Sequence, residues 1–404
     1  MASDALLHAS HAPVGLVLSG GGARAAYQVG VLRAIADLMP AQCHNPFPVI
    51  CGTSAGGLNA AGLAVYAGNL RQGVAFLESI WSDIHTHQVY RTDWYGVMRT
   101  ALRWLATMAF GGFRRHAPVS LLDNSPLRDF LAQHLRLERI HEAVRTNDLR
   151  ALCITASGYT SGASVSFFQG NPDIAGWQRS RRIGIPTAIT VDHLLASAAI
   201  PLLFPAVLVN REYFGDGALR QTAPISPALH LGAKKILVIG VSSFQSVTPP
   251  ASEGPPPHPS IAQVVNHILD SSFIDGLEAD IERLKRINRT ISFIAPDILS
   301  RDVALRPVDV LTISPSAEVL DSIAMRHAAE LPRSIRLFVR GSGATQRAGS
   351  GVLSYLLFEA AYCRELMQLG YRDGMHSRED LIRFFRAPSA HTPNEAVVPP
   401  SLPA

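Results

Sequence analysis

Gly52-Thr53-Ser54-Ala55-Gly56 fits the pattern G-x-S-x-G and stands between two segments of opposite character. The apolar run 47–51 before it predicts a buried strand, and the Ala/Gly/Leu-rich segment 55–67 after it predicts a helix. A serine on a sharp strand-to-helix turn has the geometry of a nucleophile elbow, in which small neighbours avoid steric clash. The helix end behind Ser54 would offer unpaired N–H groups to a developing oxyanion. The pentapeptide also occurs by chance in Gly/Ser-rich loops, so the interpretation depends on whether Ser54 has partners.

The composition of the chain describes a globular protein. Of its 404 residues, 47% are hydrophobic and 17% are charged, which suits one large α/β domain or two of ordinary size. No uninterrupted run of about 18 apolar residues predicts a membrane-spanning helix. The first residues lack the basic and apolar regions of a signal peptide. We therefore expect a cytoplasmic protein.

Charge and cysteine content argue against several kinds of site. The net charge of +4 is too small to indicate a nucleic-acid partner. Cys43, Cys51, Cys153 and Cys363 have no C-x-x-C spacing, which predicts buried thiols and neither a disulfide framework nor a zinc site. No His, Asp or Glu cluster has metal-ligand spacing, so we expect no metal and no cofactor.

Apolar runs that alternate with helical patterns predict a mainly parallel sheet between helices, the three-layer α/β arrangement. Strands are predicted over residues 14–19, 149–156 and 235–242, with 165–168 as a shorter edge strand and 291–294 and 308–313 as weaker candidates. Helical patterns cover residues 23–38, 55–67, 261–287, 353–369 and 379–385.

Changes in composition predict five parts of the chain. These are an N-terminal tail (1–12), a catalytic domain (13–245), a Pro-rich loop (246–260), a mostly helical C-terminal region (261–386) and a flexible tail (387–404).

Residues 85–117 interrupt the α/β rhythm of the predicted catalytic domain. From Trp94 to Ala109 apolar residues recur at helical spacing, and the segment carries five arginines against the single aspartate Asp93. A basic amphipathic helix with tryptophan suits the surface of an anionic bilayer. The alternative is a helix that packs over the mouth of the active site, and a lid would combine the two roles.

A glycine triplet, Gly20-Gly21-Gly22, follows the first predicted strand and allows several interpretations. The spacing Gly20-x-Gly22-x-x-Ala25 fits a dinucleotide-binding fingerprint, but no acidic residue for a ribose follows about 20 positions later. A P-loop is excluded because no G-K-S/T follows. An oxyanion loop suits better, since consecutive glycines expose backbone N–H groups and Arg24 adds positive charge. A tight turn without a ligand is the remaining alternative.

A third element is Tyr213-Phe214-Gly215-Asp216-Gly217-Ala218, which alone would be an ordinary Asp-Gly turn. Together, G-G-G-x-R at 20–24, G-x-S-x-G at 52–56 and D-G-A at 216–218 resemble the patatin-like phospholipase family, in the family's order. The stretch 196–205 also resembles the family's A-S-x-x-x-P-x-x-F-P segment. The resemblance spans residues 14–242.

The resemblance implies a patatin-type fold and a Ser–Asp dyad without histidine. Ser54 would be the nucleophile, and Asp216, in a loop with Gly217 and Ala218, would accept its proton. The elbow would consist of Gly52, Thr53 and Gly56 around Ser54, and the oxyanion hole would consist of Gly20, Gly21, Gly22, Ala23, Arg24 and Ala55. An ordinary Asp has a pKa of about 3.9 and is a weak base, so the site must be desolvated to raise that pKa.

A Ser-His-Asp triad is the competing mechanism. His193, His230 and His267 are available, yet none stands in a recognisable strand-end loop after an acid. We interpret them as helix or surface histidines, and Asp192 as a residue at a helix start.

We therefore expect a lipid acyl ester hydrolase of the phospholipase A or lysophospholipase type, which acts through an acyl-enzyme on a phospholipid or another acyl lipid. Peripheral contact with a membrane surface is expected with it. The alternatives are a thioesterase or acyltransferase with the same dyad, a catalytically silent lipid-binding protein, and a nucleotide-binding dehydrogenase. The sequence predicts no particular oligomeric state.

Overall fold

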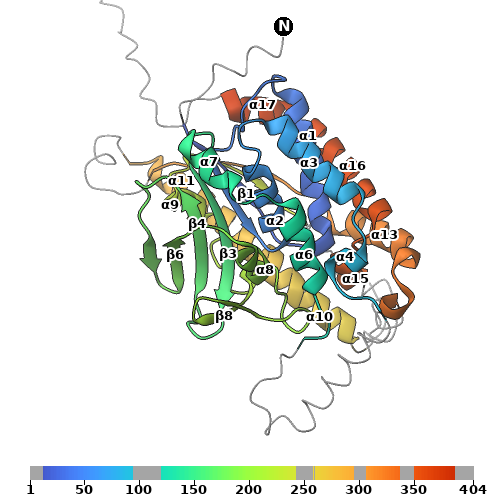
Figure 1. The fold of residues 1–404 in the computed structure, drawn as a ribbon. Coiled ribbons are helices and arrows are strands. Elements are labelled where there is room, and N and C mark those ends of the chain that lie inside the picture. Colours follow the sequence, from blue (N-terminus) through green and yellow to red (C-terminus); the bar gives the residue numbers. More distant parts are fainter. Residues whose placement is uncertain are drawn as a thin grey trace, which may run out of the picture.

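A computed structural model describes residues 12–93, 120–242, 258, 260–294, 306–336 and 350–386. In these residues a central sheet lies between layers of helices (Figure 1). The described residues leave out both predicted tails apart from residue 12, the Pro-rich loop apart from residues 258 and 260, and most of the insertion 85–117.

Five parallel strands form the centre of the sheet, in the order β10-β9-β1-β2-β3. They are β1 (Val14–Leu18), β2 (Val49–Thr53), β3 (Ala151–Gly158), β9 (Lys235–Ile239) and β10 (Asp309–Ile313). This confirms the predicted mainly parallel sheet and the weak strand candidate at 308–313. The β10 strand comes from the C-terminal part of the chain and extends the sheet beyond β9.

Beyond β3 the sheet becomes mixed. The β4 strand (Ser164–Gly170) is antiparallel to β3 and parallel to β6 (Arg182–Pro186), which pairs with β5 (Trp177–Arg179). A second branch consists of β8 (Glu212–Asp216), antiparallel to β3, and β7 (Val207–Val209). The prediction of 165–168 as an edge strand is therefore wrong, because the short, charged strands β5 and β6 cover that side of β4.

Helices account for most of the remaining described residues. The N-terminal half contains η2 (Gly22–Ala25, a 3₁₀ turn), α1 (Ala26–Leu38), α2 (Ala55–Ala64), α3 (Leu70–Ser82), α4 (Thr86–Val89), α6 (Ser125–His134), α7 (Arg139–Arg145), α8 (Val191–Ser197), η3 (Gly217–Arg220) and α9 (Ser226–His230). The C-terminal part contains α10 (Ile261–Asp270), the π-helical segment η4 (Ser271–Asp275), α11 (Gly276–Ile291), α13 (Ala317–His327), η5 (Ala328–Glu330), α15 (Ser350–Leu356), α16 (Ala360–His376) and α17 (Arg378–Arg386). The strand predicted at 291–294 is wrong, because α11 continues to Ile291 and a turn follows.

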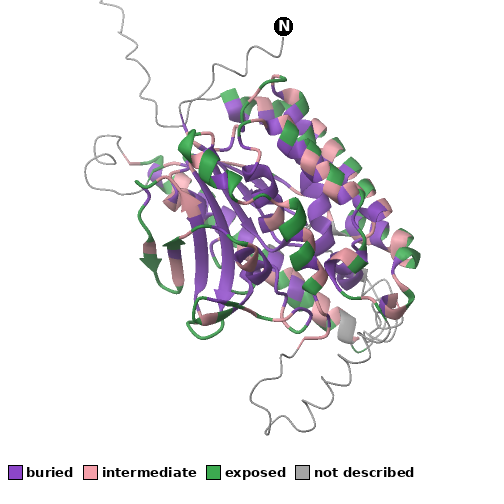
Figure 2. Cartoon of the chain, in the orientation of Figure 1, coloured by how far each residue is buried: buried purple, intermediate pink, exposed green. Residues whose placement is uncertain are grey.

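The strands β1, β2, β3 and β9 are buried along their whole length, and their residues alternate between two cores, whereas β10 at the end of the sheet is only partly buried (Figure 2). Leu16 and Leu18 face the core that contains α1, α2, α3 and α16, whereas Val17 faces the one that contains α9 and α11. This period of two places helices on both sides of one sheet.

The first and the last long helices of the described chain pack along each other. Figure 1 shows α1 (blue) beside α16 (red), and their backbones meet closely at Gly30 and Gly370. A Cβ at Gly30 would overlap the carbonyl oxygen of Met367, and one at Gly370 would overlap that of Tyr27. The C-terminal helices are thus part of the same packed body as the N-terminal strands.

No helix among the described residues is both long and apolar enough to cross a membrane.

Candidate active site

Ser54 lies at the turn between β2 and α2, as the sequence predicts. Its φ of 55° and ψ of −132° place a non-glycine residue in a strained region of backbone space. Gly56 makes the turn possible, because a Cβ there would overlap the carbonyl oxygens of Leu18 and Ser19. The Ser54 side chain is held at the carboxyl end of the sheet and is only 2% exposed.

Three hydrogen bonds hold the elbow in place. The N–H of Ser54 donates to Ser197 Oγ at 2.8 Å, and the Ser197 hydroxyl donates to the carbonyl of Thr155 at 2.6 Å. On the preceding residue, Thr53 Oγ1 donates to Gln221 Oε1 at 2.7 Å. Ser197 is fully buried at the end of α8 and belongs to the A-S-x-x-x-P stretch noted in the sequence, but its contact with Ser54 was not predicted.

Asp216 ends β8 and is 1% exposed. The N–H of Ala218 donates to Oδ1 at 3.0 Å, and Oδ2 is buried with no hydrogen bond of ordinary geometry from any described residue. Burial raises the pKa of Asp216 to about 7, against the opposing effects of the Ser54 hydroxyl and the Ala218 N–H. Gly217 lies against the carbonyl of Thr155, which places the Asp loop on β3. The structure therefore brings Ser54 and Asp216 together, from positions far apart in the sequence.

The glycine loop approaches Ser54 from the end of β1. Gly22 has a φ of +55°, and a Cβ there would overlap the carbonyl oxygen of Tyr355. The N–H groups of Gly20 and Gly21 donate to no backbone carbonyl among the described residues. Gly22, Ser54 and Ala55 line the same cavity.

Ala23 and Arg24, two further residues of the predicted oxyanion hole, use backbone groups for hydrogen bonds within the turn. Ala23 lies within η2, where its carbonyl accepts the N–H of Ala26. The N–H of Arg24 donates to the carbonyl of Gly21 at 3.1 Å, so this donor is already used. Ala55 begins α2, where the first N–H groups of a helix have no partner within the helix.

Arg24 differs from its predicted role, because its charge serves the C-terminal helices. The guanidinium is 2% exposed and lies 3.5 Å from both Asp270 and Asp321. It donates to Ser354 Oγ at 2.7 Å and lies 4.0 Å from the centre of the Tyr355 ring. Burial alone would lower the pKa of Arg24, but Tyr355, Asp270 and Asp321 raise it above its ordinary value.

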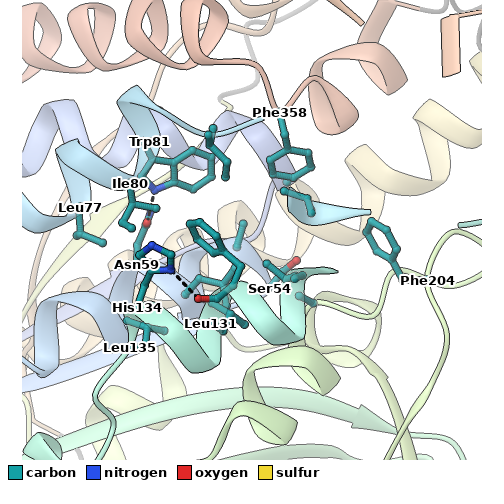
Figure 3. Close-up of a pocket in the computed structure, with 18 of the residues that line it drawn as sticks. Ser54, Asn59, Leu77, Ile80, Trp81, Leu131, His134, Leu135, Phe204 and Phe358 are labelled. Atoms are coloured by element: carbon teal, nitrogen blue, oxygen red, sulfur yellow. Dashed lines mark hydrogen bonds between the residues drawn. The ribbon is translucent and has the colours of Figure 1, made fainter. Parts of the chain in front are cut away.

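A cavity of about 800 Å³, including its mouth, begins at Ser54. In Figure 3 the labelled side chains of α3 and α6 lie to the left of Ser54, Phe204 lies to its right and Phe358 lies above it. The lining is largely apolar and consists mainly of Leu58, Phe76, Leu77, Ile80, Trp81, Ile84, Val89, Leu127, Phe130, Leu131, Leu135, Ile200, Phe204 and Phe358. A cavity of this size and character suits a long hydrocarbon chain.

The polar groups of the cavity wall are paired with each other. Trp81 Nε1 donates to Asn59 Oδ1 at 2.8 Å, and Asn59 Nδ2 donates to Gln28 Oε1 at 2.9 Å and to the carbonyl of Ala25 at 3.0 Å. Gln28 in turn donates to the carbonyl of Ser19 at 2.9 Å. The network joins the cavity wall to the glycine loop, and no sequence motif marked Asn59 or Gln28.

The histidines considered for a triad have other surroundings. His193 Nδ1 lies 2.8 Å from Thr190 Oγ1 at the start of α8, and His230 stacks on Trp177 with ring centres 4.7 Å apart. His267 lies on α10. The cavity contains His134, whose Nδ1 lies 2.8 Å from the carbonyl oxygen of Phe130.

The described residues contain no cluster of three or more His, Cys, Asp or Glu side chains that could hold a metal ion. Cys51, Cys153 and Cys363 are buried, and Cys43 is partly exposed.

A family model decides the relationship of the chain. The model for "Patatin-like phospholipase" matches residues 16–229, which include the glycine loop, Ser54 and Asp216. The chain belongs to the patatin-like phospholipase family. Its three-layer α/β fold with a mainly parallel sheet is thus the fold predicted for a patatin-like protein.

Individual relatives are more distant. A "cGAMP-activated phospholipase" of Pseudomonas aeruginosa (strain BWHPSA011 / Pa011) is 29% identical over 218 residues, which cover 53% of this chain and 55% of that protein. The chain thus matches about half the length of this relative.

Solved structures also align with most of the chain. Human GIVD cytosolic phospholipase A2 aligns with 93% of this chain and 60% of its own, at 12% identity and a TM-score of 0.44. VipD from Legionella pneumophila aligns with 94% of this chain and 92% of its own, at 12% identity and a TM-score of 0.27.

Proposed function

We propose that this chain hydrolyses acyl esters of lipids, as a phospholipase A or lysophospholipase, with Ser54 as nucleophile and Asp216 as the group that accepts its proton. The observation that supports this most strongly is one arrangement. A buried carboxylate with an unpaired oxygen lies beside a strained serine, where a long apolar cavity begins. Few structural roles require these features together.

In the first step Ser54 Oγ attacks the ester carbonyl carbon while its proton passes to Asp216. The raised pKa of Asp216, about 7, makes the carboxylate a useful base near neutral pH. The C–O bond to the leaving alcohol then breaks, and Asp216 returns the proton to the alcohol oxygen. The acyl chain stays on Ser54 and occupies the apolar cavity.

The tetrahedral oxyanion would be held by backbone N–H groups of the glycine loop and of Ala55. Gly22 and Ala55 flank Ser54 in the cavity lining, and Ala55 begins a helix. These donors are fixed before reaction, so they stabilise the charge without reorganisation. Water then attacks the acyl-enzyme, Asp216 takes one proton from that water, and Ser54 regains its hydroxyl as the fatty acid leaves.

Contact with a lipid surface is part of the proposal. Leu208 and Tyr213 are paired across β7 and β8 and are 52% and 55% exposed. Leu202, with a φ of 66°, is 59% exposed. These side chains belong to the segments that lead into Asp216, so a bilayer could contact them beside the site. The predicted interfacial helix of residues 85–117 is largely outside the described residues and remains a separate prediction. Liposome sedimentation of Leu208→Ser with Tyr213→Ser would show weaker binding.

The test of the chemistry compares wild type with Ser54→Ala and Asp216→Asn on mixed phospholipid vesicles, with released fatty acid as the readout. Both variants should lose at least about a hundredfold in rate, as is typical for loss of a nucleophile or base. Ser292→Ala and Asp192→Asn are matched controls, because Ser292 is exposed, Asp192 is half-buried and pairs with Arg128, and neither lines the cavity. Full activity in either site variant would refute the dyad.

Substrate comparison separates the alternatives. A thioesterase would prefer acyl thioesters over phospholipids of the same chain, and an acyltransferase would need an acceptor. A silent lipid-binding protein would not react with a fluorophosphonate at Ser54.

A further inference from the structure

The β3–β4 and β5–β6 turns lie side by side at the edge of the sheet that holds Ser54. The strands β2 and β3 are parallel, so the carboxyl end of β3 lies at the same edge as the Ser54 elbow. Ser164 begins β4 directly after the turn 159–163, and it pairs with Arg182 at the start of β6. The hairpin 179–182, which joins β5 to β6, is therefore a neighbour of the β3–β4 turn.

The β7–β8 hairpin extends from the same edge. The β8 strand is antiparallel to β3, and Phe214 pairs with Gly158, the last residue of β3. The turn 210–211 therefore projects beyond the end of β3 (Figure 1). Arg220 ends η3 and lies against the β3–β4 turn, because a Cβ at Gly162 would lie 4.0 Å from Arg220 Cζ. Four segments of the chain thus meet at one edge of the sheet.

This edge is strongly basic. We define the basic edge as the three turns together with η3, that is, residues 159–163, 179–182, 210–213 and 217–220. It contains five arginines: Arg179, Arg181, Arg182, Arg211 and Arg220.

One carboxylate of the basic edge is engaged elsewhere. Besides the buried Asp216 next to it, the acid of this edge is Glu212. Glu212 Oε1 accepts the N–H groups of Thr160 and Ser161, at 2.8 and 2.6 Å. That carboxylate therefore holds the β3–β4 turn, and no described arginine forms an ion pair with it.

Three of the arginines are exposed: Arg181, Arg211 and Arg220. None of them forms an ion pair with an acid among the described residues, whereas Arg150 pairs with Asp173 at 2.8 Å. They do not line the cavity that begins at Ser54, so they are not placed to hold the acyl chain. Their charge faces a partner outside the protein.

Aromatic and apolar side chains are interspersed with the arginines. Tyr159 is 52% exposed, and it lies over β8, because a Cβ at Gly215 would lie 2.5 Å from the Tyr159 hydroxyl oxygen. Tyr213 is two residues from Gly215, so it is on the same face of β8, and it is paired with the exposed Leu208. Tyrosines are enriched where a protein surface meets lipid headgroups, because the ring is apolar and the hydroxyl is polar.

We propose that the basic edge binds the negatively charged headgroups of an anionic bilayer and so holds Ser54 against the lipid. The inference rests on the proposed function, because it names the kind of surface that supplies the substrate. Each arginine near such a surface strengthens binding about fivefold. A polyanion such as DNA would use the arginines alone and leave Leu208 and Leu219 in water, whereas a bilayer contacts both kinds of side chain.

The binding experiment uses the full chain as Ser54→Ala, so that no lipid is consumed. Sedimentation is measured with vesicles of phosphatidylcholine alone and with an equal mixture of phosphatidylcholine and phosphatidylserine. The chain should bind the mixed vesicles at least about tenfold more tightly, and added salt should remove most of that difference. Arg181→Gln, Arg211→Gln and Arg220→Gln together should weaken binding to the mixed vesicles about a hundredfold.

The matched control removes three charges from another face. Arg364, Arg372 and Arg378 are exposed on α16 and α17, form no ion pair with a described acid, and lie away from β6 and β8 (Figure 1). Arg364→Gln, Arg372→Gln and Arg378→Gln together should bind both kinds of vesicle as the parent chain does.

Three outcomes would overturn the proposal. One is an equal loss in the two triple variants, which would mean that only the net charge matters. Another is equal binding of the parent chain to both kinds of vesicle. The third is a DNA duplex that binds through the same three arginines more tightly than the mixed vesicles do, which would assign the basic edge to a different polyanion.

Fatty acid release from the same vesicles separates this inference from the proposed function. With Ser54 intact, the triple variant at the basic edge should lose far more rate on mixed vesicles than on p-nitrophenyl butyrate, a soluble ester; equal losses would overturn the inference. A chain that binds mixed vesicles through the basic edge but releases no fatty acid would refute the proposed function and support the binding surface. A chain that binds and hydrolyses both kinds of vesicle equally would refute only this inference.

Discussion

Arg24 and Asp216 are two buried charges of the same site, and they are treated in opposite ways. Arg24 is surrounded by partners: Asp270, Asp321, Ser354 and Tyr355 all contact its guanidinium. Asp216 has one backbone donor on Oδ1 and no described hydrogen-bond partner on Oδ2. The fold surrounds the Arg24 guanidinium with partners and leaves Asp216 Oδ2 without a hydrogen-bond partner among the described residues.

The difference separates a group that holds the site together from a group that we propose takes part in its chemistry. A saturated buried charge stabilises the fold only while its partners stay in place. An unsaturated one costs stability and keeps its capacity to bind a proton. Arg24 thus acts as a clamp that joins the glycine loop to the C-terminal helices. The proposed base Asp216 instead lowers the stability of the folded protein whenever its buried carboxyl group is charged.

Removing the clamp should have the largest effect. Arg24→Met leaves Asp270 and Asp321 beside an apolar side chain, which should lower the free energy of unfolding by about 3–5 kcal/mol. Urea denaturation measures it. Arg33→Met is the matched control, because Arg33 lies on α1, is 54% exposed and pairs only with Glu78 among the described acids. A loss equal to that of the control would remove the distinction between clamp and surface charge.

Neutralising Asp216 should change stability in the opposite direction. Its pKa of about 7 exceeds the ordinary 3.8. Ionisation of the buried carboxyl group above pH 7 therefore lowers the free energy of unfolding. At 1.36 kcal/mol per unit, the cost at pH 8 is at most about 4 kcal/mol. Asp216→Asn should therefore be more stable at pH 8, and the gain should shrink as pH falls toward 4, because the folded carboxyl is then protonated and the unfolded one is only partly ionised.

Thermal unfolding of wild type and Asp216→Asn across pH 4 to 8 measures this difference. Asp192→Asn, at a half-buried aspartate paired with Arg128, gives the baseline. A lower stability of Asp216→Asn than of wild type at pH 8 would contradict the claim that the charged Asp216 destabilises the folded protein. In wild type, kcat/KM should rise with pH through about 7, as Asp216 loses its proton.

A substitution at Ser197 tests how the elbow is held, because Ser197 positions Ser54, the proposed catalytic partner of Asp216. Ser197→Ala leaves the N–H of Ser54 without its acceptor. An unsatisfied buried donor lowers the free energy of unfolding by about 1–3 kcal/mol. We expect kcat to fall about tenfold with little change in KM, since Ser197 positions Ser54 and does not line the cavity. Ser197→Thr keeps the hydroxyl and should restore part of the rate. A change in KM alone would show that Ser197 acts on substrate binding instead.

The smallest effect is expected for one partner of the clamp. Asp270 is 29% exposed and also accepts hydrogen bonds from Tyr355 and Asn266, at 2.8 Å each. An asparagine can still accept from Tyr355, and Arg24 keeps Asp321. Asp270→Asn should therefore cost about 1 kcal/mol in urea denaturation. A loss as large as that of Arg24→Met would mean that the clamp depends on a single ion pair.

The sequence predicted the parts of the site that are local. Ser54, the glycines before it and the Asp-Gly turn each follow a strand end, so their chemistry is encoded within a few residues. The strand alternation and the parallel sheet were predictable for the same reason. Ser197 stood inside a recognised segment, but only the folded chain shows that its hydroxyl accepts from Ser54.

The rest depends on contacts between distant segments. Arg24 looked like a source of positive charge for an oxyanion, because its partners Asp270, Asp321 and Ser354 are far away in the sequence and carry no motif. The apolar residues 291–294 resembled a strand, although the amphipathic pattern of α11 continues into Ile291. Tertiary packing decided both cases.

The pairing of α1 with α16 has a consequence for synthesis. Gly30 is translated about 340 residues before Gly370, which at ~5–20 residues per second is roughly 20–70 s. During that interval Arg24 lacks Ser354 and Tyr355, and the loop at Gly22 lacks the wall against which it turns. A nascent chain thus carries the serine and aspartate well before the glycine loop is braced. A protein that attacks lipids would in this way become competent only after α15 and α16 have been translated.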